Sequence, residues 1–180
     1  MNKEFDRQFN IHFDDHIQEL ADKPGYATAW RTRELRGGDN YSEGVMEQEY
    51  QQIYAISDPA LFKSFPQNPP PPVMEKEPWR RDIGNWGRVF YRVLSLIEKD
   101  DRSGRCWARC ESNVRGAAAE TKFQSESAQH LKHVLELPGI HRAWQLQHAP
   151  HSAQIGTDPA GNYMHLYEAD APENLFDPSL

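Results

Sequence analysis

The sequence predicts an α+β fold built from two copies of one helix–strand–strand unit. The main observation is an internal repeat, because the stretch His16 to Arg31 recurs without a gap, 114 residues later, as His130 to Gln145. A second block, which begins at Tyr50, recurs from Tyr163 at an offset of 113 residues. Two blocks in the same order at nearly the same offset indicate a tandem duplication.

Each copy of the first block begins with an amphipathic helix. Its apolar residues fall at helical spacing, as Ile17, Leu20 and Ala21 do in the first copy and Leu131, Val134 and Leu135 in the second. A Pro-Gly pair follows in both copies, where the proline ends the helix and the glycine turns the chain. The pattern predicts helices over residues 1–22 and 117–136.

Two strands and a short helix follow in each copy. Alternating bulky residues after the Pro-Gly pair predict a first strand, and the tyrosine-rich blocks predict a second. Asp58–Pro59 and Ala171–Pro172 then open a short helix, because proline suits a first helical turn. Helix, strand, strand and helix make up most of a ferredoxin-like, or split βαβ, unit.

The remaining segments predict a first strand for the second unit but not for the first. Residues 88–97 are predicted to form the first strand of the second unit, whereas the first unit has no counterpart before Phe5. We expect that either this strand is absent from the first unit or the true N-terminus is missing from the sequence. Residues 105–111 are either a short strand or the far arm of a hairpin with 88–97. Four consecutive prolines favour an extended spacer, so we expect units at 1–66 and 87–180 joined by a linker at 67–86.

Composition excludes several classes of protein. The 180 residues include five Trp, seven Tyr and eight Phe, which is enough to build a core, and carry a formal net charge of −7. The acidic balance argues against nucleic acid as the main partner. No run approaches the length of a membrane helix, and the N-terminus has no apolar core of a secretory signal. Two cysteines give no disulfide framework, so we expect a cytoplasmic protein.

The two tyrosine strands present the same kind of face. One parity carries Tyr50, Gln52 and Tyr54 in the first copy, and Tyr163, His165 and Tyr167 in the second. The other parity carries Ile53 and Leu166, which we expect beneath the helices. Two tyrosine faces brought together would enclose a mostly aromatic space with a few polar groups, as small-molecule sites do. The alternative is a solvated face, which antiparallel sheets often have.

The ordered pattern resembles the EthD-like branch of the dimeric α+β barrel superfamily. The features that carry the resemblance occur twice and in the same order. They are Phe9, His16, Pro24, Gly25, Trp30, Tyr50, Tyr54 and Pro59, then Phe123, His130, Pro138, Gly139, Trp144, Tyr163, Tyr167 and Pro172.

The resemblance implies two ferredoxin-like sheets that meet face to face in a pseudo-dimeric barrel formed by one chain. It also implies a cavity for a small aromatic or polyketide-like compound and, in related proteins, chemistry without a cofactor. His16 and His130 are the positions that the resemblance favours for proton transfer, which a neutral imidazole can perform. His165 is the alternative base. Tyr50, Gln52, Tyr54, Tyr163, Tyr167, Trp30 and Trp144 would contact the substrate.

Histidine pairs raise the question of a metal site. His12 and His16 stand four residues apart on the predicted helix, near Asp14 and Asp15, a spacing that can chelate. The sequence places no third ligand, so we predict no metal and no cofactor.

Two functions remain open. The first is an enzyme that transforms a small aromatic or polyketide-like molecule by acid–base chemistry. The second is a non-catalytic pseudo-dimer that binds a hydrophobic ligand or a protein. We expect a monomer or a homodimer with no membrane partner.

Overall fold

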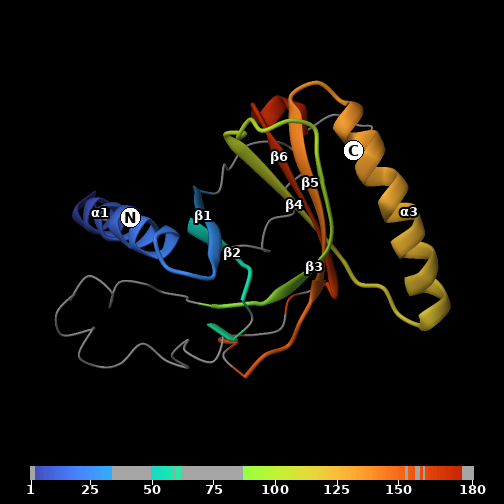
Figure 1. Cartoon of the computed structure of the whole chain (residues 1–180), viewed down its shortest axis with the longest axis horizontal. Helices are drawn as coiled ribbons and strands as arrows, with labels where there is room; N and C mark the ends of the chain where they lie inside the picture. Colours follow the sequence, from blue (N-terminus) through green and yellow to red (C-terminus); the bar gives the residue numbers. More distant parts are fainter. Residues whose placement is uncertain are drawn as a thin grey trace. The chain divides into compact units, whose positions relative to one another are not determined.

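The computed structural model describes residues 3–33, 50–58, 60–61, 87–152, 154–156, 159 and 161–175. The chain divides into two compact units, Met1–Arg88 and Val89–Leu180. Within the described residues the fold is mixed α+β, with one antiparallel sheet in each unit (Figure 1). The predicted linker at 67–86 lies outside the described residues, as do Pro59 and the side chains of Phe9 and Tyr50.

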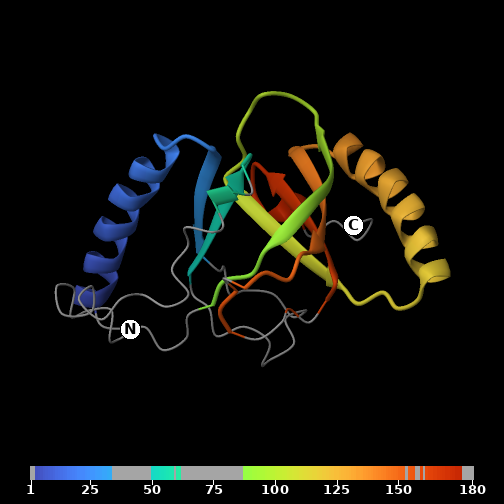
Figure 2. The same cartoon turned by 60° about the horizontal axis from the view of Figure 1, so that its bottom comes forward.

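Unit 1 is one helix against a two-stranded sheet. Helix α1 spans Lys3–Ala21, and strands β1 (Tyr26–Arg33) and β2 (Tyr50–Ile56) pair antiparallel. The predicted helix and both predicted strands are confirmed. The helix runs alongside β1 (Figure 2) and buries Phe13 and Leu20.

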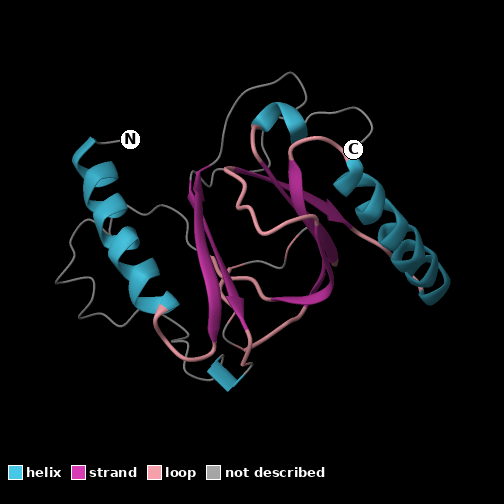
Figure 3. Ribbon diagram, turned by 45° about the horizontal axis from the view of Figure 1, so that its top comes forward, coloured by secondary structure: helices cyan, strands magenta, loops and turns pink. Residues whose placement is uncertain are grey.

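Unit 2 is a four-stranded antiparallel sheet with one long helix on one face (Figure 3). Its elements in chain order are β3 (Tyr91–Glu98), β4 (Cys106–Ser112), α3 (Ala117–Glu136), β5 (Ile140–His148), β6 (Tyr163–Ala169) and the 3₁₀ helix η3 (Pro172–Leu175). The strand order is β3-β5-β6-β4. Strand β6 therefore lies between β4 and β5, the two strands that α3 connects, which is the arrangement of a split βαβ unit.

Strands β3 and β4 do not form a hairpin. They lie at opposite edges of the sheet, so the hairpin alternative for residues 105–111 is wrong and the strand alternative is confirmed, with observed bounds Cys106–Ser112. The connection crosses the end of the sheet, because the N–H of Lys99 bonds the carbonyl of His141 on β5 and the N–H of Arg105 bonds that of Ala169 on β6. Backbone bonding to two successive interior strands carries the chain from one edge to the other.

The Pro-Gly turns have the same backbone in both units. Gly25 and Gly139 have φ of +90° and +76°, a region that favours glycine. The carbonyl of each glycine accepts a 2.9 Å bond from a residue just after the tyrosine strand, Ser57 or Asp170. A bulge in the strand pairing also follows each glycine. In unit 2 the short helix begins as predicted, since η3 starts at Pro172. In unit 1 residues 60–61 are in 3₁₀ conformation, and the predicted start at Pro59 lies outside the described residues.

The core of unit 2 lies between α3 and the sheet. It consists of aliphatic helix residues against small and aromatic strand residues, namely Leu131, Val134, Leu135, Ile140, Ala143, Tyr167 and Ala169. The helix residues of this core, Leu131, Val134 and Leu135, lie in the C-terminal half of α3. The N-terminal half therefore covers a different part of the same sheet face, and that part is more polar.

A buried polar cluster closes one end of the unit 2 sheet. The fully buried His141 ring places Nε2 at 2.6 Å from Asp170 Oδ1 and Nδ1 at 3.2 Å from Asp100 Oδ1. The buried Glu168 carboxylate accepts hydrogen bonds from the Gly104 N–H at 2.7 Å and from Arg142 at 2.9 Å. These contacts join the connection between β3 and β4 to the two interior strands, which is a structural role.

Candidate functional site

Helix α3 covers the tyrosine face of β6, with Phe123 from its N-terminal half and His130 from its C-terminal half. The Phe123 ring lies 5.0 Å from the Tyr163 ring and 5.6 Å from the His165 ring, with the latter pair stacked at 22°. The His130 ring lies 5.6 Å from that of His165 and 6.0 Å from that of Tyr167. Phe123 and His130 are seven residues apart, so both fall on the face of the helix toward the sheet.

This arrangement corrects the predicted direction of the faces. We expected Leu166 beneath the helix and Tyr163, His165 and Tyr167 on the opposite face, yet the opposite is found. The period of two fixes which side chains share a face but not which face receives the helix. Both faces of β6 carry bulky residues, so either could fill a core. The rings of Phe123 and His130 on α3 pack against the face that carries the tyrosines.

Hydrogen bonds order the tyrosine side chains. His130 Nε2 lies 2.8 Å from the Tyr167 hydroxyl. The Tyr163 hydroxyl oxygen accepts bonds from Gln124 Nε2 at 3.3 Å and Gln147 Nε2 at 3.2 Å. Because both Tyr163 contacts use the oxygen as acceptor, the hydroxyl hydrogen can be donated to a further group.

Two neighbouring buried nitrogens lack a hydrogen-bond partner among the described residues. They are Nε2 of Gln145, a residue 3% exposed, and Nε2 of His165, which is 8% exposed. The two residues are directly opposite in the β5–β6 register, so they share the helix-covered face. A buried polar group without a partner costs about 1–3 kcal/mol, which makes such groups rare unless they have a use.

Burial keeps the titratable groups of this cluster neutral at pH 7. Desolvation, with a smaller contribution from His130, lowers the pKa of His165 to about 4. Desolvation and the nearby His133 also lower the pKa of His130. Burial raises the pKa of the Tyr167 hydroxyl well above its usual value. Two neutral imidazoles and a protonated phenol therefore lie together, and a neutral imidazole can accept a proton.

The cluster reaches solvent along edge strand β4. His130 is half-exposed, and Cys110, the register partner of His165 on β4, is exposed. Desolvation nevertheless raises the pKa of the Cys110 thiol, so the sulfur is protonated at neutral pH. A protonated thiol is a weak nucleophile, which leaves the imidazoles as the reactive groups.

The equivalent positions of unit 1 are filled by side chains that bond one another. Arg31 stands where unit 2 has Gln145, and it donates to the Asn10 carbonyl at 3.1 Å and lies 3.2 Å from Asp14 Oδ1. Gln52 stands where unit 2 has His165, and its Oε1 accepts a 2.6 Å bond from the Tyr54 hydroxyl. Polar groups that unit 2 leaves unpaired are thus paired in unit 1.

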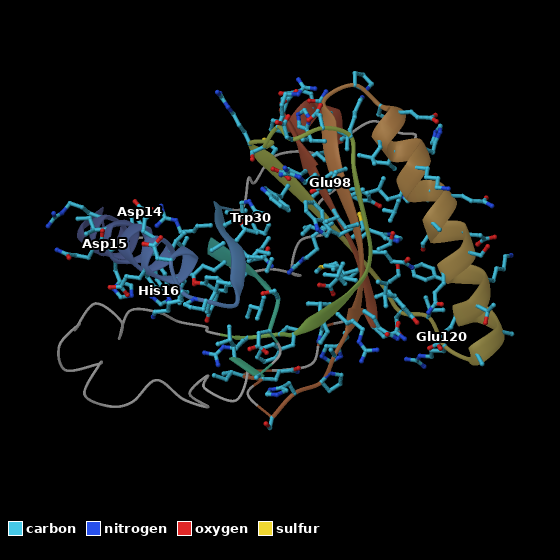
Figure 4. The ribbon with its side chains drawn as sticks, in the orientation of Figure 1. Asp14, Asp15, His16, Trp30, Glu98 and Glu120 are labelled. Carbon is cyan, nitrogen blue, oxygen red and sulfur yellow. The ribbon has the colours of Figure 1, made fainter. Side chains whose placement is uncertain are left out.

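His16, Trp30 and Trp144 are described within their own units. His16 stacks on His12, with ring centroids 5.9 Å apart, on helix α1 (Figure 4). Trp144 is the register partner of Leu166, so it lies on the sheet face away from α3, stacked on Trp107 at 5.1 Å. Trp30 likewise has the parity opposite to Arg31, the residue that meets α1. The predicted single pocket with tyrosines and tryptophans together is therefore divided between two faces in each unit.

Sequence reasoning missed Gln145, Phe123 as a stacking partner of His165, and the glutamine pair that holds Tyr163. The parity of β5 gave no clear signal for Gln145, because the same face carries Gln147 as well as Ala143. A buried glutamine directly opposite a histidine can be identified only once the strand register is known.

Comparison of the chain with protein-family models, curated proteins and solved structures found no match. Among the described residues, no three His, Cys, Asp or Glu side chains gather closely enough to hold a metal ion. None of the described helices is long and apolar enough to cross a membrane.

Proposed function

We propose that unit 2 binds a small aromatic or polyketide-like molecule between α3 and the sheet and moves a proton on it without a cofactor. The observation that carries the proposal is the buried His165 Nε2, unpaired among the described residues beside an equally unpaired Gln145 Nε2. Phe123 and Tyr163 supply aromatic surface next to these nitrogens. Aromatic walls with a few polar groups are typical of small-molecule sites.

The two histidines take different roles in this mechanism. With its proton on Nδ1, His165 presents the Nε2 lone pair as the general base toward a bound molecule. The Tyr167 hydroxyl donates to His130 Nε2 and keeps the proton of that ring on Nδ1. With Nε2 accepting and Nδ1 protonated, His130 has no lone pair for a further proton, and it holds the Tyr167 hydroxyl beside the base. His165 is thus the catalytic base, and His130 with Tyr167 forms the pair that positions it.

The internal pairing in unit 1 supports the assignment of the active site to unit 2. Arg31 with Asp14, and Tyr54 with Gln52, satisfy each other there. We further propose that both units are ferredoxin-like and arose by tandem duplication, supported by the shared glycine turns and equivalent elements. Closure of the two sheets into a barrel stays a prediction from the EthD-like resemblance.

The test uses the full chain with a panel of bicyclic aromatic ketones, phenols and acids. Binding is followed by ligand-observed NMR, and conversion by the NMR spectrum of the ligand. We expect His165→Gln to retain binding and lose conversion by about 10²–10⁴-fold, the range for removal of a general base. Lys132→Gln, on the exposed face of α3, is the control. Conversion that is equal in wild type and His165→Gln would overturn the proposal.

A second candidate is a non-catalytic binding unit, favoured by the other sheet face of unit 2. That face carries the Trp107–Trp144 stack and, on edge strand β3, Val93 and Leu96, which are 56% and 45% exposed. Exposed aliphatic side chains beside a tryptophan pair are typical of a surface that contacts a hydrophobic partner. Binding that Trp107→Ala abolishes and His165→Gln leaves unchanged, without conversion of any ligand, would favour this candidate.

A further inference from the structure

We infer that Gln145 selects the ligand of this site by donating a hydrogen bond to an uncharged carbonyl oxygen, so that the substrate class is an enolisable aromatic ketone. The inference rests on the proposed function, because it assigns a substrate class to the same site. It goes further in naming the recognising atom, Gln145 Nε2, and the bond that is broken.

The first step of the argument is the direction of the available hydrogen bonds. Gln145 Nε2 carries two N–H groups and has no acceptor among the described residues. The Tyr163 hydroxyl accepts two bonds from glutamines, so its hydrogen is left to donate. Tyr163 and Gln145 are diagonal neighbours on the same face, two register positions apart, since Tyr163 pairs with Gln147. The site therefore offers donors, and its ligand must offer an acceptor oxygen.

The second step is the charge of the site. Both imidazoles are neutral at pH 7, because burial lowers the pKa of His130 and of His165. Among the described strand residues of this face, the one basic side chain is Arg92, which is exposed on edge strand β3. A carboxylate would lose its hydration without gaining a cation, which is costly. A neutral carbonyl loses little and gains the Gln145 bond.

The third step is the position of the base. His165 is the register partner of Gln145, so a molecule whose carbonyl oxygen meets Gln145 has its neighbouring carbon near His165 Nε2. Nε2 takes a proton from that carbon, the C–H electron pair forms a C=C bond, and the carbonyl π pair moves to the oxygen. The resulting enolate accepts hydrogen bonds from the Gln145 N–H and the Tyr163 O–H. Return of a proton to the same carbon completes an exchange that needs no oxidant or reductant.

The experiment measures deuterium exchange at C1 of 2-tetralone in D₂O, by proton NMR, with the full chain. The dissociation constants of 2-tetralone, 2-naphthol and 2-naphthoate are measured alongside. We expect 2-tetralone to bind at least about tenfold more tightly than 2-naphthoate, because the ketone gains one hydrogen bond and no charge has to be buried. We expect Gln145→Leu to slow the exchange by about 10²-fold, as loss of an oxyanion donor does.

A control variant and a stability measurement keep the outcome interpretable. Gln129→Leu makes the same change on the exposed face of α3 and should leave exchange and binding as in wild type. Gln145→Leu should melt no lower than wild type, because it removes an unpaired amide, so a loss of exchange cannot be attributed to unfolding.

The outcomes separate the two proposals. If 2-naphthol or 2-naphthoate binds and its conversion depends on His165 while 2-tetralone is ignored, the proposed function stands and the carbonyl inference is overturned. Exchange of 2-tetralone that His165→Gln abolishes and Gln145→Leu leaves unchanged also overturns the inference. If none of the three probes binds, or if exchange does not depend on His165, both proposals fail.

Discussion

At the scale of single residues, His165 couples the proposed chemistry to the stability of unit 2. Its pKa is about 4 in the folded chain, because of burial, against 6.5 for an exposed imidazole. Between these values the unfolded chain holds a proton that the folded chain does not. The stability that depends on a neutral His165 is therefore complete above about pH 6.5 and is lost as the pH falls toward 4.

This coupling predicts the pH dependence of unfolding. The free energy of unfolding of unit 2 should fall between pH 6.5 and 4, and His165 should account for up to about 3 kcal/mol of the decrease. Urea titrations followed by circular dichroism at pH 7, 5 and 4 measure it. His165→Gln removes the titrating group, so its slope should be shallower. Parallel slopes for the two proteins would show that His165 is solvated.

Gln145 should trade stability for function. In Gln145→Leu the unpaired amide is replaced by an apolar group of similar size, so we expect the free energy of unfolding to rise by about 1 kcal/mol. Urea unfolding at pH 7 measures the change, with Gln129→Leu as the exposed control. A loss of more than 1 kcal/mol in Gln145→Leu would mean that the amide has a structural partner.

The sequence predicts residue roles only as far as they follow from pattern. The period of two predicts that Tyr163, His165 and Tyr167 share a face. It does not place His130 beside them, because the helix was expected against the other face. Gln145 was not recognised, because its importance depends on a cross-strand register that connects residues twenty positions apart. The side that meets the helix was assigned wrongly, since Leu166 and Tyr167 are both bulky enough to fill a core.

At the scale of elements, the two Pro-Gly turns determine where each helix ends and the following strand begins. A Cβ on Gly139 would lie 2.6 Å from the Asn174 side chain, whose Oδ1 is held by the N–H of Ala171. Gly116, at the start of α3, has a similar φ of +92° but open space around it. A substitution at Gly116 therefore tests backbone strain alone, whereas one at Gly139 tests strain together with crowding.

These glycines give a prediction with a built-in control. Gly116→Ala should lower the free energy of unfolding by about 1 kcal/mol through backbone strain alone. Gly139→Ala should cost about 2–3 kcal/mol, because the new methyl group also displaces Asn174 from η3. Thermal and urea unfolding of both variants give the order. Equal losses would mean that Asn174 moves aside at no cost.

Element types and approximate bounds follow from the sequence, whereas some pairings do not. The helical periodicity gave α3 its bounds at residues 117 and 136, and the tyrosine blocks gave β2 and β6. The hairpin alternative for β3 and β4 failed because partners that are distant in sequence depend on the whole sheet. Local turn residues such as those at 100–104 favour a reversal of the chain in either case.

At the scale of the whole molecule, the two units differ in how much structure supports each strand. Strands β5 and β6 are interior strands of a four-stranded sheet, whereas β1 and β2 form a pair within the described residues. Two-stranded sheets are marginal in water unless they are packed against other elements. The two units should therefore resist local opening to different degrees.

Hydrogen exchange measured by mass spectrometry tests this difference. Amides of β5 and β6 should exchange at least about tenfold more slowly than those of β1 and β2, because interior strands open only with their whole sheet. Peptides that cover residues 26–33 and 140–147 are matched by the repeat and give a direct comparison. Equal protection of the two peptides would contradict the expected order.

The sequence predicted the differences between the two units less completely than it predicted their elements. The repeat indicated two units of one plan, and the chain divides into two compact units. The repeat did not show that Arg31 and Gln52 of the first unit satisfy their neighbours whereas Gln145 and His165 of the second do not. Equivalent elements can carry different side-chain pairings, and under the proposed function those pairings decide which unit binds the ligand.

Strand β4 is anchored at both ends, and this bears on its thiols. A methyl group on Gly104 or Gly161 would collide with backbone at 2.5 Å or 2.7 Å, and the Asn162 amide clasps both the N–H and the carbonyl of Val114. A slip of one position would turn Cys110 out of the row that contains His165 and bring Arg109 into it. The rate at which iodoacetamide alkylates Cys110 should therefore report how often strand β4 pairs out of register, both in newly synthesised and in mature chains.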